Sequence, residues 1–101
     1  MEIGNAYVYW MSVCAEERKI LNTALNVYMS QDEDDITPSA WEDAANAYGT
    51  LNSRETDEYH ISELEAMRDA LIHLKETGPV PEKDMETLDE MIDSLCKMTL
   101  W

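Results

Sequence analysis

The stretch PEKDMETLDEMIDSL, residues 81–95, joins an apolar helical stripe to a dense run of carboxylates. Its apolar residues recur at steps of three and four, the spacing of one face of an α-helix, and they continue beyond the stretch: Met85, Leu88, Met91, Ile92, Leu95 and Met98. We therefore predict a helix that starts at Pro81, turns this stripe toward the core and ends near Leu100 and Trp101.

The segment before this stretch has the same period. A helix is predicted over residues 55–76, and its inward positions are Ile61, Leu64, Met67, Leu71 and Leu74. Gly78 and Pro79 follow, as is common after the C-terminus of a helix. Because the connection is short, we expect this helix and the next one to pack as an antiparallel hairpin.

Further upstream, SQDEDDITPSAW at residues 30–41 predicts the start of another helix. Thr37 suits the N-cap position, and Pro38 suits the first helical position, where its missing N–H does no harm. Gly49 is the expected stop of this helix. The helix is therefore predicted to be short, with an acidic loop in front of it.

The first part of the chain is predicted to be one long helix over residues 5–29. Its apolar face consists of Tyr7, Met11, Cys14, Leu21, Leu25 and Tyr28. The cluster AYVYW at residues 6–10 is the one place that leans toward β-structure. The sequence therefore predicts an all-α fold, a single acidic helical domain over residues 1–101, built as an up-down bundle of about four helices, three long and one short.

The chain is strongly acidic. It has 22 Asp and Glu against 7 Lys and Arg, which gives a formal net charge of -15 over 101 residues. Such a charge repels nucleic acid, because binding phosphates requires basic groups, and it repels anionic membrane surfaces as well. A basic protein surface would be attracted.

The start of the chain carries no cationic signal region, and no apolar run approaches the ~18 residues of a membrane span. We therefore expect a cytoplasmic protein. Cys14 and Cys96 lack the spacing of a zinc or CxxC site, so we expect two buried free thiols; the alternative is an internal disulfide, which an oxidising compartment would favour.

No pattern of catalytic residues is found, and we expect no enzyme activity and no cofactor. His60 and His73 are thirteen residues apart on one predicted helix, which turns them away from a common ligand. The run DEDDITPSAWED resembles a calcium loop, but Ile36 and Pro38 replace two oxygen ligands. Phosphate-binding glycine loops and nucleophile elbows are absent from the sequence.

The acidic residues are therefore the candidate functional feature. On the last predicted helix, like charges are neighbours at i, i+3 and i+4, which destabilises an isolated helix. Carboxylates one turn apart rise by about 6 Å, close to every second phosphate of a DNA strand at ~3.4 Å spacing. The candidate partner-binding residues are Asp32, Glu33, Asp34, Asp35, Glu42, Asp43, Glu82, Glu86, Asp89, Glu90 and Asp93.

In size, charge and helicity the chain resembles the small acidic helical proteins by which phages block host nucleic-acid enzymes, such as DNA-mimic restriction inhibitors and some anti-CRISPR proteins. The acidic helical immunity proteins of bacteria bind basic nuclease toxins by the same electrostatics. The resemblance implies a non-enzymatic inhibitor that occupies the basic site of a nucleic-acid-handling protein. This hypothesis requires a contiguous anionic face, and neutralising Glu82, Glu86, Glu90 and Asp93 should then abolish binding.

Two other functions are compatible with the sequence. One is an oligomerising structural or regulatory adaptor, including a homodimer, that contacts its partners through aromatic and Met side chains. The other is a small-ligand binder between helices. Salt distinguishes the first hypothesis from the adaptor, because charge-driven binding weakens steeply with salt whereas an apolar interface persists.

Overall fold

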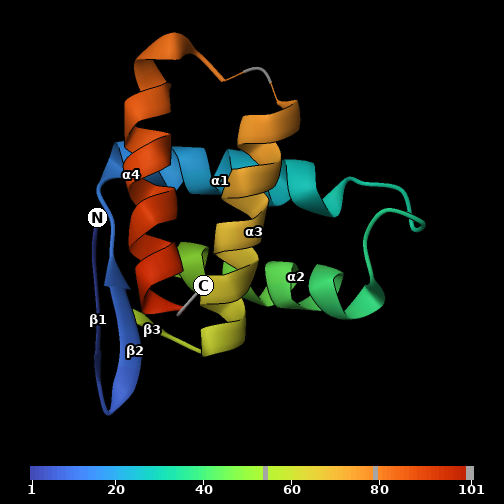
Figure 1. The fold of residues 1–101 in the computed structure, drawn as a ribbon. Coiled ribbons are helices and arrows are strands. Elements are labelled where there is room, and N and C mark those ends of the chain that lie inside the picture. Colours follow the sequence, from blue (N-terminus) through green and yellow to red (C-terminus); the bar gives the residue numbers. More distant parts are fainter. Residues whose placement is uncertain (54, 79, 100–101) are drawn as a thin grey trace.

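A computed structural model describes residues 1–53, 55–78 and 80–99. These residues form a β-hairpin, two helices, a short strand and two further helices (Figure 1): β1 (Glu2–Ala6), β2 (Val8–Ser12), α1 (Ala15–Met29), α2 (Pro38–Ser53), β3 (Glu58–Tyr59), α3 (Ile61–Thr77) and α4 (Glu82–Met98). The three strands make one antiparallel sheet in the order β1-β2-β3. The fold is therefore α+β, and the all-α prediction is wrong.

A β-hairpin takes the place of more than two turns at the start of the predicted first helix. Gly4 pairs with Trp10 across the two strands, and a Cβ at Gly4 would lie 2.6 Å from the indole ring, so the glycine makes room for Trp10. Tyr7 stands in the turn at φ 74° and is fully exposed. Aromatic and β-branched residues favour strands, and here they outweigh the helical spacing.

Helix α1 starts only at Ala15, and the placement of its apolar residues is partly as predicted. Leu21 and Leu25 are completely buried, as the helical face requires. Cys14 and Tyr7, which were assigned to the same face, are exposed instead, because both precede the helix.

The predicted start of α2 is confirmed. The backbone N–H of Ala40 donates to Thr37 Oγ1 at 3.1 Å, and Pro38 is the first helical residue. The predicted stop at Gly49 is wrong, because the helix continues to Ser53. Gly49 is exposed, and no atom lies within 4 Å of the position that its Cβ would take.

Helices α3 and α4 form the antiparallel hairpin that the sequence predicts (Figure 1). The backbone N–H of Gly78 donates to the Leu74 carbonyl at 2.8 Å and closes α3. The predicted start of α3 near residue 55 is wrong, because Tyr59 pairs with Tyr9 of β2 and holds the preceding residues extended. Leu100 and Trp101, the predicted end of the last helix, lie outside the described residues.

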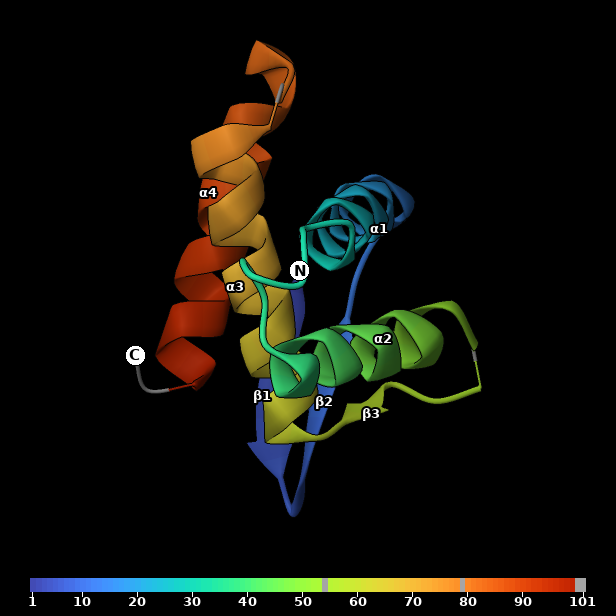
Figure 2. The same ribbon diagram turned by 90° about the vertical axis from the view of Figure 1, so that its right-hand side faces the viewer.

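The core lies around α3, which packs against α1, α2 and α4. Helices α1 and α2 run across the α3–α4 pair instead of alongside it (Figure 2), so the arrangement differs from the up-down bundle. The inward positions predicted for the last two helices are confirmed where they are deepest: Leu64, Met67, Leu71, Leu88, Met91 and Leu95 are at most 1% exposed.

Candidate functional site

The five candidate acids of α4 form one row, which we call the α4 patch. All five are exposed, and at ~100° per residue they fall within about one quarter of the helix circumference: Glu82, Glu86, Asp89, Glu90 and Asp93. The row of carboxylates predicted on this helix is therefore present, on the side away from the core.

Lysines reduce the net charge of the α4 patch. Lys75 Nζ of α3 lies 2.5 Å from Asp89 Oδ1, and Lys97 Nζ lies 2.9 Å from Asp93 Oδ2 one turn earlier. Lys83 is also exposed on this helix. Two of the five carboxylates thus already have a cationic partner within the chain.

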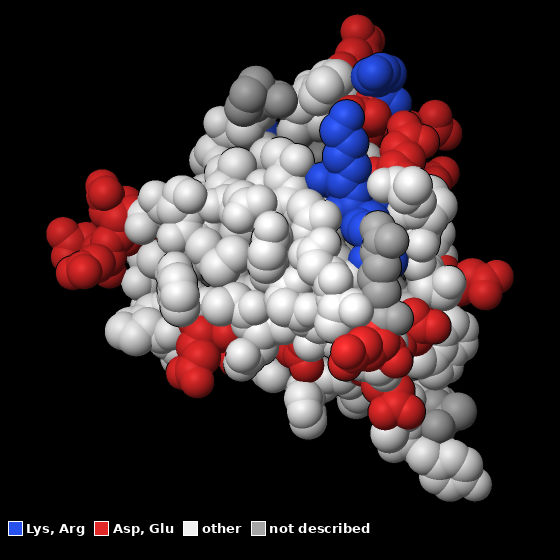
Figure 3. Space-filling model, turned by 180° about the vertical axis from the view of Figure 1, so that it is seen from behind, with Lys and Arg blue, Asp and Glu red and all other residues white. Residues whose placement is uncertain are grey.

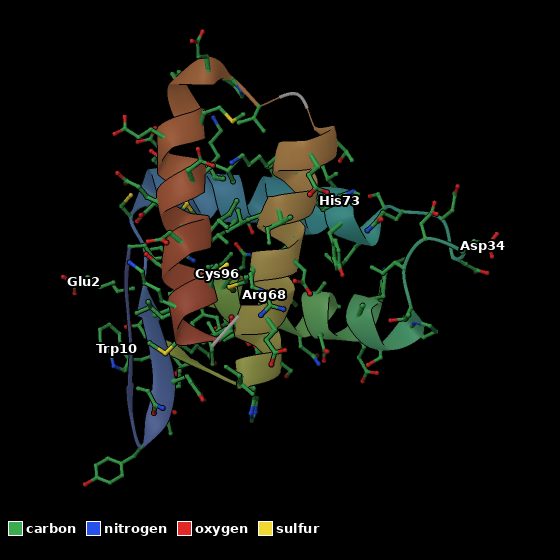
Figure 4. All side chains as sticks on the ribbon, in the orientation of Figure 1. Glu2, Trp10, Asp34, Arg68, His73 and Cys96 are labelled. Atoms are coloured by element: carbon green, nitrogen blue, oxygen red, sulfur yellow. The ribbon has the colours of Figure 1, made fainter. Side chains whose placement is uncertain are left out.

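The other candidate acids lie on the α1–α2 loop and the start of α2. Asp32, Glu33, Asp34 and Asp35 are all exposed, and Asp34 marks the far end of the loop in Figure 4. The loop is anchored by Ile36, which is 9% exposed. An ordered backbone therefore presents four adjacent carboxylates to solvent.

Two acids that the sequence analysis did not select lie beside Asp43 of α2. Glu65 and Asp69 of α3 line a small pocket of about 120 Å³ together with Asp43 of α2. We call the whole set the loop patch, which consists of Asp32, Glu33, Asp34, Asp35, Glu42, Asp43, Glu65 and Asp69. Residues 43, 65 and 69 were difficult to connect from sequence, because they meet only through the packing of α2 on α3.

The loop patch carries little internal neutralisation. Among the described residues, the ion pair seen in this patch joins Arg68 Nε to Asp69 Oδ1 at 3.0 Å. Burial raises the pKa of the Tyr28 hydroxyl in the small pocket; the negative charges of Asp69 and Asp43 raise it further, and Arg68 opposes them. The carboxylates around this pocket thus add to the effect of burial on the Tyr28 hydroxyl.

The two patches lie on opposite sides of the molecule. The loop with Asp34 extends from one side, and α4, which carries Cys96, forms the other (Figure 4). Seen from behind, the acids lie in several separate groups, at the edges of the face and across its lower part, and basic side chains lie in its upper part (Figure 3). The single band that the sequence led us to expect therefore does not form, and any contiguous anionic face belongs to one patch alone.

Comparison with protein-family models, with curated proteins and with solved structures gives no match. The site is therefore interpreted from its own geometry. In the described residues, no group of three or more His, Cys, Asp or Glu side chains is placed to hold a metal ion. Within the same residues, none of the helices has the length and apolar character needed to cross a membrane.

Two carboxylates differ from the rest because they are buried: Glu17 is 9% exposed and Glu63 is 5% exposed. Each lies in the first turn of a helix and caps it. Glu17 Oε1 accepts from the backbone N–H of Cys14 at 2.9 Å, and Glu63 Oε1 accepts from that of His60 at 3.1 Å. A carboxylate at this position also interacts favourably with the positive end of the helix dipole.

The second oxygen of Glu17 has a cationic partner. The amino group of Met1 lies 2.6 Å from Glu17 Oε2. Burial alone would raise the pKa of the Glu17 carboxyl, but the hydrogen bonds from Cys14 and Met1 outweigh it and hold this pKa below its usual range. In turn, the hydrogen bond to Glu17 raises the pKa of the Met1 amino group.

The second oxygen of Glu63 has no partner among the described residues. Oε2 is shielded from solvent and accepts no hydrogen bond. Glu63 lines a cleft of about 510 Å³, which we call the tyrosine cleft; its lining also includes Tyr7, Tyr9, Glu58, Tyr59 and His60. Sequence analysis missed this cleft because its tyrosines belong to the hairpin that was predicted as helix.

The two histidines and the two cysteines were the other candidate residues of the sequence. His60 precedes α3, whereas His73 lies further along that helix and packs edge-on against Tyr28, with ring centroids 5.9 Å apart. Both cysteines are free, but Cys14 is exposed and Cys96 is half-buried, so the expectation of buried thiols is wrong.

Proposed function

We propose that this protein is a non-enzymatic acidic binding protein that occupies the basic, nucleic-acid-binding surface of a protein partner in the cytoplasm. One observation carries the proposal: the loop patch has four exposed carboxylates on the α1–α2 loop and four more on α2 and α3, and among the described residues the ion pair seen within it is that of Arg68 with Asp69. Solubility alone is served by a net charge of about 2 to 8 in magnitude, well below that of this chain.

The loop patch is the stronger of the two candidate surfaces. It lies on an anchored loop and two helix faces, and in the part of the chain that the structure describes Arg68 is the cation paired with it. The α4 patch has the more regular spacing but includes the lysine pairs at Asp89 and Asp93. We therefore expect the loop patch to make the main contact with the partner and the α4 patch to contribute less.

The resemblance to phage inhibitors supports a nucleic-acid-handling enzyme as the partner, with a restriction or CRISPR enzyme as one form of it. An acidic surface that covers the basic site would exclude the nucleic acid from it. Charge complementarity of this kind also speeds association, and the effect falls with rising salt.

The adaptor remains the second candidate, now with a different contact surface. The exposed large hydrophobic side chains among the described residues are Tyr7, Val8 and Trp41, and no Met belongs to them. Strand β1 is an edge of the sheet, with β2 on one side. A free strand edge favours pairing with another chain, including a second copy of this one.

The test compares four forms of the protein as bait in a bacterial lysate at low salt. The loop variant carries Asp32→Asn, Glu33→Gln, Asp34→Asn and Asp35→Asn, and the α4 variant carries Glu82→Gln, Glu86→Gln, Glu90→Gln and Asp93→Asn. A matched control removes the same four charges elsewhere, at exposed residues of other elements: Glu2, Glu55, Asp57 and Glu76. Bound proteins are eluted with a salt gradient and, separately, with excess DNA.

We expect the wild type and the control to retain the same basic protein, which DNA displaces, and the loop variant to lose it. The α4 variant, for which the sequence alone predicted a complete loss of binding, should now retain the partner and release it at lower salt, because the α4 patch is expected to contribute less. Equal retention by all four forms would contradict the proposal. Retention that survives high salt would favour the adaptor.

A further inference from the structure

The molecule contains an internal comparison between two buried glutamates in the same structural position. Glu17 and Glu63 each cap the helix that they begin, and each uses Oε1 for the backbone. Glu17 completes its hydrogen bonding with an ammonium group, that of Met1. Glu63 is buried more deeply, yet its Oε2 has no partner among the described residues.

A buried oxygen without a partner is costly, because the carboxylate has lost water and gained nothing in return. Such groups are rare in folded proteins, and they mark sites where a missing group completes the structure. At α1 the group that completes the equivalent glutamate is a cationic nitrogen. A cationic nitrogen would likewise give Glu63 Oε2 the partner that it lacks.

The walls of the tyrosine cleft suit an organic cation better than a metal ion. Tyr7, Tyr9 and Tyr59 line it, and aromatic faces attract the cationic groups of Lys and Arg. A metal ion requires several oxygen ligands in a compact group, which the described residues do not provide. Glu58 adds a second negative charge to the cleft.

Tyr7 provides a further indication. It is fully exposed and adopts φ 74°, a left-handed conformation that costs a bulky residue about 1–2 kcal/mol and that glycine adopts freely. Strained residues of this kind gather at binding sites, where the surrounding structure holds them for a purpose. Tyr7 is itself one of the residues that line the cleft, in the exposed turn of the hairpin.

We propose that the tyrosine cleft receives one Arg or Lys side chain of the basic partner protein, with its cationic group at Glu63 Oε2 and its methylene groups against the tyrosine rings. The inference rests on the proposed function, and it adds a specific anchor to a diffuse electrostatic contact. Because Oε2 is shielded in the unbound structure, binding requires side-chain rotamer changes at the cleft wall, which are common when complexes form.

The experiment needs no partner protein. The isotope-labelled chain is titrated with Nα-acetyl-arginine amide and, in parallel, with Nα-acetyl-citrulline amide, which has nearly the same shape but no charge. Amide and tyrosine ring signals are followed by NMR. The variants are Glu63→Gln, which keeps the size of the side chain, and Glu58→Gln, a matched loss of charge in the same cleft.

We expect the arginine probe to shift the signals of residues 58–64 and of the cleft tyrosines, with binding in the millimolar range, and the citrulline probe to shift them far less. Glu63→Gln should weaken arginine binding at least about tenfold, because it removes the buried charge, whereas Glu58→Gln should weaken it only slightly. Equal binding of the two probes would overturn the inference. Equal effects of the two variants, or shifts confined to the loop patch, would do the same.

A second variant covers the case in which Glu63→Gln does not fold. Tyr9→Leu removes one aromatic wall and leaves the α3 cap untouched, so it should also lose arginine binding, and unchanged binding would overturn the inference. The loop variant provides the link to the proposed function. It should bind the arginine probe as the wild type does even if it loses the partner, so failure of either idea can be recognised separately.

Discussion

At the scale of single residues, burial sets the chemistry of the tyrosine cleft. Burial raises the pKa of the Tyr59 hydroxyl to about 12; Arg18 opposes the increase, and Asp57 and Glu63 add to it. Tyr59 is 8% exposed and belongs to the core cluster. Burial is thus the main cause of the raised pKa of Tyr59, and Glu63 makes the smallest of these contributions.

The raised pKa of Tyr59 predicts how the stability of the protein depends on alkaline pH. The pKa of Tyr59 is about 12 in the folded protein and about 10 in the unfolded chain, so the unfolded chain releases its proton first. The contribution of the buried neutral phenol is complete below pH ~10 and is lost as the pH rises toward 12. Glu63→Gln should lower the pKa of Tyr59 and leave it above 10, since burial remains the main cause.

The measurement is an NMR titration of the tyrosine ring carbons, with Tyr59→Phe to assign the signal and Glu58→Gln as the control. Glu58 is not among the groups that shift the pKa of Tyr59, so its amide should leave that pKa near the wild-type value. If Glu63→Gln leaves the pKa unchanged as well, Glu63 either carries no charge or lies too far away, and the cleft lacks its anionic anchor.

The sequence gives only a weak signal for these two glutamates. Each glutamate is three residues after the N-cap residue of its helix, which is the spacing of a capping box. However, Cys14 and His60 occupy the positions where Ser or Thr makes the motif recognisable. Predicting that Glu63 would be buried and unpaired requires the tertiary contacts of α3.

At the scale of elements, the sequence predicted the parts of the fold that local chemistry determines. Thr37 and Pro38 define the start of α2, and the regular stripes of α3 and α4 define their hairpin. The N-terminal hairpin was missed because Met11 and Tyr7 satisfy a helical spacing and also fit a short strand pair. Strand β3 was missed because two residues, Glu58 and Tyr59, have no detectable period of their own.

Two glycines near helix ends should respond in opposite ways to the same substitution. Gly49 lies inside α2 with open space around it, so Gly49→Ala should stabilise the protein by about 0.5–1 kcal/mol by restricting the unfolded chain. Gly78 closes α3, and a Cβ there would lie 2.5 Å from Leu74 Cδ1 and 2.9 Å from the Leu74 carbonyl oxygen. Gly78→Ala should therefore destabilise by about 1–3 kcal/mol, as overpacking does.

Denaturant unfolding of both variants checks this pair, since the free energy of unfolding is measured directly. The slope of the transition should stay constant, because neither change alters the surface that unfolding exposes. A destabilised Gly49→Ala variant would mean that α2 ends at residue 49 in solution, as the sequence had suggested.

At the scale of the whole molecule, topology decides which acids become neighbours. The row on α4 could be predicted, because Glu82, Glu86 and Glu90 are related by the helix period alone. The separation of the α1–α2 loop from α4 could not, since it depends on how α1 and α2 cross the α3–α4 pair. Asp43 and Asp69 line the same pocket for the same reason, because α2 crosses α3 there.

The same layout predicts where negative charge is costly to the fold. Glu86 lies one turn from both Glu82 and Glu90, and each such pair of like charges costs about 0.2–0.5 kcal/mol. Glu86→Gln removes both repulsions, so it should raise the free energy of unfolding by about 0.5–1 kcal/mol at low salt. The gain should disappear near 1 M salt, where the screening length falls to about 3 Å. Asp93→Asn is the matched control, because it removes repulsion from Asp89 and Glu90 but also the ion pair with Lys97 at 2.9 Å, so the two effects oppose each other and the net gain should be small. Urea unfolding at low and high salt measures both variants, since urea adds no ions of its own. An equal gain from the two substitutions would mean that stability responds to net charge alone and that the position of each carboxylate on α4 is irrelevant.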